Sequence, residues 1–114
     1  MHELGIVFHV IKRLEKLAQE KSLKKIQSVT LELGEVSGVI PAYLEDCWKW
    51  AVKKTEIMQE AVLVTETVKA VTRCNACGRT YPTVEHGKTC PHCQSEDTVL
   101  AQGKEMWIKQ IEAC

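Results

Sequence analysis

The chain has 114 residues, 45% hydrophobic and 26% charged, which is the composition of a globular protein. Fifteen basic residues balance fifteen acidic ones, so no overall field attracts nucleic acid. No apolar run reaches the roughly 20 residues that cross a bilayer, and Glu3 and His9 disfavour a signal peptide. We therefore expect a cytoplasmic protein whose six cysteines are metal ligands or free thiols before they are disulfides.

The first half of the chain predicts a helix, a strand and a second helix. Apolar residues recur at steps of three and four through residues 4–20, which is typical of an amphipathic helix. Over residues 28–36 the period changes to two, which predicts a half-buried strand. Pro41 suits the first turn of a helix. The apolar positions that follow it have helical spacing: Leu44, Cys47, Trp48 and Ala51.

The second half predicts two strands on either side of a cysteine-rich segment. Residues 61–72 are rich in Val and Thr and predict a long strand, and regular structure resumes near Val99 and continues to about Ile111. Between them, residues 74–93 hold cysteines, glycines and prolines with almost no aliphatic side chains. The flanking strands can therefore pair antiparallel around this insertion.

These elements together predict an α+β fold, in which a small three-stranded antiparallel sheet and two helices carry an inserted zinc-ribbon-like module. We expect residues 1–72 and 98–114 to form the α+β domain and residues 73–97 to form a zinc-binding module.

Two Cys-x-x-Cys pairs, Cys74 with Cys77 and Cys90 with Cys93, are separated by twelve residues. A two-residue spacer lets one tight turn present both sulfurs to one ion, and four thiolates suit tetrahedral Zn(II). With every position taken by sulfur, the zinc would be structural rather than catalytic. There are three alternatives to zinc. Iron can use the same four thiolates. Two disulfides would need an oxidising compartment, and thioredoxin-type chemistry uses a single pair at the start of a helix.

His92 lies between two of these cysteines. It is either an exposed loop imidazole or a group that responds to pH near 6–7 and alters the zinc site.

The first three residues, Met1, His2 and Glu3, form a candidate Ni(II) site. The Met1 amine, the His2 amide and imidazole nitrogens and the Glu3 amide can form a plane of four nitrogens, which Ni(II) or Cu(II) prefers. The Glu3 carboxylate can orient the imidazole or cap the first helical turn. A frayed terminus is the alternative, but the apolar helix that begins at Leu4 ties these ligands to an ordered element.

Met1-His2-Glu3 before an amphipathic helix, then Leu31-Glu32-Leu33-Gly34-Glu35 in a strand, then two Cys-x-x-Cys pairs, resembles the HypA/HybF family of hydrogenase nickel-incorporation proteins. The resemblance covers essentially the whole chain. It implies nickel at Met1, His2 and Glu3 as transferred cargo, and zinc at the four cysteines. It also implies two partners, a nickel-binding maturation GTPase and the [NiFe]-hydrogenase large subunit, with urease a recipient in some members. We expect a monomer or weak homodimer.

Two other classes of function compete with this interpretation. A zinc-ribbon module for transcription or translation would carry basic and aromatic side chains that contact nucleic acid. The cysteine-rich segment holds few of these, namely Arg79, Tyr81 and Lys88, and the chain is neutral. An enzyme would need a phosphate loop, a nucleophile elbow or an open metal triad, and the sequence contains none of these motifs. We therefore expect a metallochaperone that is not an enzyme.

Overall fold

The computed structural model describes residues 3–114. The elements in chain order are α1 (Glu3–Lys21), β1 (Ile26–Gly34), α2 (Pro41–Val52), β2 (Val62–Val68), β3 (Val71–Cys74), β4 (Thr80–Pro82), α3 (Thr83–His86), β5 (Thr98–Gln102) and β6 (Met106–Ala113). They form two compact units. The helical unit comprises the chain up to Glu32 with Val39–Glu66 and Trp107–Cys114, and the cysteine unit comprises Leu33–Gly38 and Thr67–Met106. Within residues 3–114, no helix combines the length and hydropathy that a membrane span needs.

Helix α1 follows the apolar period of the sequence and has a defined end. Its buried residues recur at helical spacing: Val7, Val10, Ile11, Leu14 and Ala18. At the C-terminus, Ser22 adopts a left-handed φ of 54°. The backbone N–H of Leu23 donates to the carbonyl of Ala18, and that of Ser22 donates to Gln19. These two bonds form a Schellman motif, which pairs carbonyls that the helix would leave unsatisfied.

Helix α2 begins at Pro41, as the sequence predicts. It buries one apolar face: Leu44, Trp48, Ala51 and Val52. The indole N–H of Trp48 donates to the carbonyl of Ala61 at 3.0 Å, so this buried polar group is paired. The beginning of α2 lacks a cap of its own, because Ile40 at the N-cap has no polar side chain and no acidic residue lies in the first turn.

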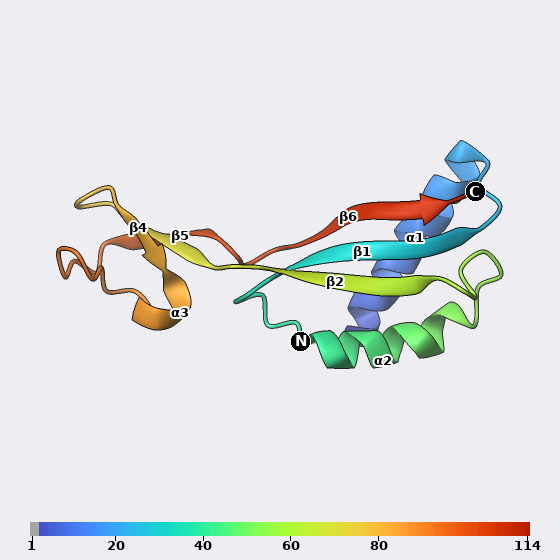
Figure 1. The fold of residues 1–114 in the computed structure, drawn as a ribbon, viewed down its shortest axis with the longest axis horizontal. Helices are drawn as coiled ribbons and strands as arrows, with labels where there is room; N and C mark the ends of the chain where they lie inside the picture. The colour runs from blue at the N-terminus through green and yellow to red at the C-terminus, as the bar shows by residue number, and fades with distance from the viewer. Residues whose placement is uncertain (1–2) are drawn as a thin grey trace. The chain divides into compact units, whose positions relative to one another are not determined.

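A three-stranded sheet has the order β2, β1, β6 (Figure 1). Lys25 and Cys114 exchange both backbone hydrogen bonds, the pattern of antiparallel pairing, so β6 is antiparallel to the chain that leads into β1. The N–H of Ile26 at the start of β1 donates to Ile57, which precedes β2. The N–H of Glu35 just after β1 donates to Val68, the last residue of β2. Strands β1 and β2 therefore run in the same direction, which the connection through α2 permits.

A second sheet, in the cysteine unit, has the order β4, β3, β5, and both of its pairs are antiparallel. Close to it, three backbone segments approach one another. A Cβ on Gly34 would lie 2.1 Å from the carbonyl oxygen of Gly103, and one on Gly103 would lie 2.4 Å from the Cα of Ala70. The Glu35 carboxylate accepts the N–H of Ala70 at 2.9 Å. Glycine is therefore required at both 34 and 103, and at Gly103 the φ of +102° requires it as well.

The predicted α+β fold, with two main helices, a three-stranded sheet and an inserted cysteine module, is confirmed. The sheet is mixed rather than wholly antiparallel, because β2 follows β1 through helix α2 and runs in the same direction. The antiparallel pairing of the strands before and after the insertion is also present, between β3 and β5. The single long strand expected over residues 61–72 is divided into β2 and β3, with Lys69 and Ala70 between them. The assignment of residues 1–72 with 98–114 to nickel binding, and of 73–97 to zinc binding, stays a prediction.

Candidate metal sites

The two Cys-x-x-Cys pairs form turns of the same shape. In the first, the N–H of Gly78 donates to the carbonyl of Cys74 at 2.9 Å. In the second, the N–H of Gln94 donates to the carbonyl of Cys90 at 2.8 Å. The residue after each pair has a positive φ, 75° at Gly78 and 62° at Gln94. Each turn thus folds the chain sharply around its pair of thiols, and the first uses glycine where left-handed backbone costs least.

A second hydrogen bond is repeated in both turns. The N–H of Cys74 donates to the carbonyl of Arg79, and the N–H of Cys90 donates to the carbonyl of Ser95, in each case five residues further along the chain. The first cysteine of each pair is buried, whereas Cys77 and Cys93 are exposed. The four thiols therefore comprise a buried inner pair, Cys74 and Cys90, and an exposed outer pair, Cys77 and Cys93.

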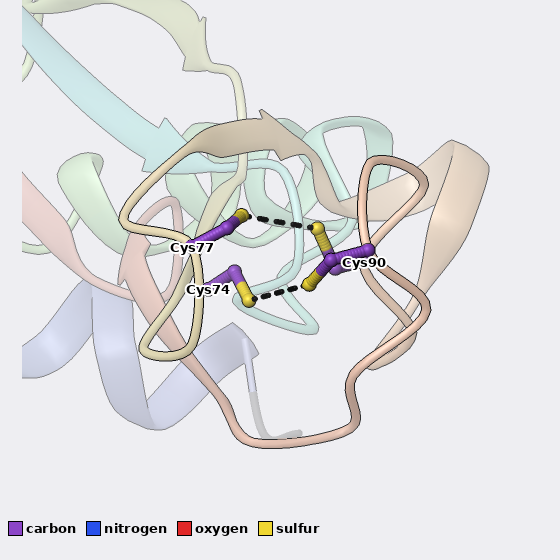
Figure 2. Close-up of side chains that lie close together, drawn as sticks. Cys74, Cys77 and Cys90 are labelled. Atoms are coloured by element: carbon purple, nitrogen blue, oxygen red, sulfur yellow. Dashed lines mark hydrogen bonds between the residues drawn. The ribbon is translucent and has the colours of Figure 1, made fainter.

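The four sulfur atoms converge on one point (Figure 2). All lie within 4.8 Å of one another. The Sγ atoms of Cys74 and Cys93 are 3.5 Å apart, and those of Cys77 and Cys90 are 3.7 Å apart. Sulfurs at about 2.3 Å from a tetrahedral zinc ion would be separated by about 3.8 Å, whereas disulfide sulfurs are bonded at about 2.05 Å. The donor set and its spacing fit Zn(II) and do not fit disulfides.

The packing around these thiols is sparse. Tyr81 is buried in one cluster with Cys74 and Cys90, and its hydroxyl donates to the carbonyl of Gly87 at 2.9 Å. The ring of His86 meets that of Tyr81 edge to face at 5.8 Å. This cluster holds no aliphatic side chain. Small cysteine modules with so little apolar burial usually take most of their folding free energy from a bound metal.

Hydrogen bonds separate the pKa values of two of the cysteines. Backbone N–H donation from Cys77 is the main reason that the pKa of Cys74 is lowered to about 7. At Cys93 the backbone N–H of Ser95 lowers the pKa, but bonds with the other cysteine sulfurs and desolvation outweigh it and raise the pKa to about 12. Without metal, Cys93 keeps its proton at neutral pH. A metal ion held by these sulfurs would have to displace such protons, so acidification would weaken its binding.

His92 contributes its backbone to this site. Its N–H lies 3.4 Å from the Cys90 sulfur and donates to it, while the residue as a whole is exposed. The pH response proposed for its imidazole stays a prediction.

Of the predicted nickel ligands, Met1 and His2 lie outside the described residues. Glu3 is the first residue of α1 and is half-buried. Its carboxylate accepts the backbone N–H of Ile40 at 3.2 Å. The sequence predicts that this carboxylate contacts the His2 imidazole or caps the first turn of α1. Its hydrogen bond with the N–H of Ile40 was not predicted. The available signal was the second helix itself, which begins after a residue that cannot cap it.

Comparison with known proteins places this chain among metal-handling proteins. Residues 1–113 match the sequence model of the HypA family, described as hydrogenase/urease nickel incorporation, metallochaperone. Hydrogenase maturation factor HypA of Dehalococcoides mccartyi is 32% identical over 98% of this chain and 93% of the relative. The corresponding factor of Geobacter metallireducens is also 32% identical, over 98% of each chain.

Solved structures agree on the fold. The solution structure of the Ni metallochaperone HypA from Helicobacter pylori superposes with a TM-score of 0.75 at 24% identity, covering 99% of this chain and 97% of that one. A second HypA solution structure gives a TM-score of 0.77 at 23% identity. The family description names a metallochaperone and not an enzyme, which confirms the prediction of a non-catalytic protein. The chain belongs to the HypA family of nickel-incorporation metallochaperones.

Proposed function

We propose that this protein binds Ni(II) at its N-terminus and delivers it for [NiFe]-hydrogenase maturation, while its four cysteines hold a structural zinc ion. The observation that carries the proposal is the family match, which extends over residues 1–113 and so includes the N-terminal segment. The hydrogenase maturation factors among the relatives support a hydrogenase as recipient. The family description also includes urease, which is the alternative recipient.

The nickel ligands we propose are the Met1 amine, the main-chain and imidazole nitrogens of His2, and the main-chain nitrogen of Glu3. These atoms can close fused five- and six-membered chelate rings in one plane, the geometry that Ni(II) prefers. A terminal site with a single side-chain ligand suits a carrier, because a recipient can displace the nitrogens one after another.

The zinc ligands we propose are Cys74, Cys77, Cys90 and Cys93, whose sulfurs lie at distances that suit one tetrahedral ion. Bound zinc would supply a cross-link between the two turns. The turns present the thiols, and Tyr81 is buried in one cluster with Cys74 and Cys90. A site with four sulfurs leaves no position for water, so the role is structural.

The proposed partners are a nickel-binding maturation GTPase, which would act with this protein, and the large subunit of [NiFe]-hydrogenase, which would receive the metal. We also propose that the protein is cytoplasmic and that it is a monomer or a weak homodimer.

A calorimetric titration of Ni(II) into the zinc-loaded protein tests the N-terminal site. The protein with a free amine should bind one equivalent tightly, and the same protein with an acetylated N-terminus should bind at least about tenfold more weakly, because acetylation removes one of four nitrogens. Zinc content should be equal in both samples. Equal nickel affinities for the free and blocked proteins would place the site elsewhere in the chain.

A further inference from the structure

The carboxylate of Glu3 lies where two helices begin. Glu3 is the first residue of α1, and its carboxylate Oε2 accepts the N–H of Ile40, the residue immediately before α2. The two residues are 37 positions apart in sequence and belong to the same unit. One acidic side chain therefore serves the N-termini of both helices, where the helix dipoles favour negative charge.

Helix α2 needs such a group from outside. N-caps are normally Ser, Thr, Asp or Asn, whose side-chain oxygens accept backbone N–H groups at the helix start. Ile40 occupies this position with no side-chain hydrogen bond, and the first turn of α2 holds no acidic residue. Pro41 removes one N–H from the first turn but leaves the N–H of Ile40 to be paired. Glu3 supplies both the acceptor oxygen and the negative charge that the sequence of α2 lacks.

We propose that the Glu3 carboxylate is a positioning group, which caps α2 from α1 and thereby fixes the first helical turn for nickel. This inference rests on the proposed function, in which the main-chain nitrogen of Glu3 is a nickel ligand. Anchoring the side chain restricts the backbone at Glu3, so less conformational freedom remains to be lost when the adjoining nitrogens close around the ion. In this role the carboxylate contributes to nickel affinity without being a ligand.

Three variants separate capping from coordination. Glu3→Ala removes the acceptor. Glu3→Gln keeps an oxygen that can accept the N–H of Ile40 but removes the charge. Glu15→Ala is the matched control, because Glu15 is an exposed acidic residue in the middle of α1. None of the three changes alters the main chain or the imidazole of His2.

Without nickel, the zinc-loaded Glu3→Ala protein should melt a few degrees lower than the parent, about 4 °C, as expected for loss of a helix cap. Glu3→Gln should recover at least half of that loss, and Glu15→Ala should melt within about 1 °C of the parent. A Glu3→Ala protein that melts like Glu15→Ala would overturn the capping role. This measurement holds even if nickel binds elsewhere, so it is independent of the proposed function.

With nickel, Glu3→Ala should weaken binding by about tenfold while the visible absorption of the bound Ni(II) keeps the parent's bands, since the four nitrogens are unchanged. Glu3→Gln should recover most of the affinity with the same spectrum. If Glu3→Gln instead loses affinity as fully as Glu3→Ala, and both shift the Ni(II) bands, the carboxylate is itself a ligand and the positioning role is wrong.

Discussion

Replacing Cys74 by Ala is expected to release zinc and to unfold residues 74–93. Cys74 is buried and is one of four sulfurs that can hold a single ion. Because the buried cluster beside it consists of Cys74, Tyr81 and Cys90 alone, little apolar burial remains to replace the metal. Metal binding in such sites contributes on the order of 10 kcal/mol to folding. Zinc analysis of the dialysed protein and amide hydrogen exchange over residues 74–93 measure the two effects.

The helices should survive this change, because their core is formed by other residues, including Val7, Leu14, Leu44 and Trp48. Far-ultraviolet circular dichroism should therefore keep most of its helical signal. Cys114→Ala is the matched control, since Cys114 is an exposed thiol outside the cluster and its loss should leave zinc content at one equivalent. Iron instead of zinc in protein isolated from native cells would show that the metal assignment is wrong.

Replacing His2 by Ala is expected to abolish tight Ni(II) binding, with affinity reduced on the order of 100-fold or more. The imidazole is the only side-chain nitrogen in the proposed ligand set, and its removal opens one of the fused chelate rings. Zinc content and melting temperature should stay close to those of the parent, because the buried core of the described residues begins at Val7. Calorimetric titration and thermal unfolding of the same samples measure both results.

His9→Ala provides the matched control, because His9 is an exposed histidine on α1 and is not a proposed ligand. It should bind nickel as the parent does. Nickel affinity that survives the loss of His2 would move the site, and His92 beside the cysteines would be the first residue to replace next.

Much of the fold and of the zinc site could be predicted from the sequence because the signals are local. The helical period of residues 4–20 and Pro41 at a helix start depend on neighbouring residues alone. The spacing of two cysteines by two residues defines a turn whatever the rest of the chain does. These predictions match α1, α2 and the convergent sulfurs.

The features that could not be predicted depend on residues far apart in sequence. The bond between Glu3 and Ile40 joins positions 37 residues apart. The uncapped start of α2 indicates that an acceptor is needed there, but it does not specify Glu3. The interruption of the expected long strand at Lys69 and Ala70 accompanies the close approach of Gly103 to Ala70. The left-handed backbone at Gln94 is a local feature that was not predicted, because a positive φ is uncommon for glutamine and here the turn that presents Cys90 and Cys93 imposes it.

Adding a single residue before Met1 tests most directly whether the terminal amine carries nickel to its recipient. The extension converts the Met1 amine into an amide and changes which nitrogens can close chelate rings with the His2 imidazole, although every side chain remains. Nickel binding alone is not decisive, because a histidine in third position behind a free amine is itself a good planar chelator of Ni(II). The measurement is therefore hydrogenase maturation in cells that carry the extended protein. Maturation should fail with the extension in place and recover when it is cleaved off cleanly, whereas full maturation with an intact extension would contradict a required role for the terminal amine.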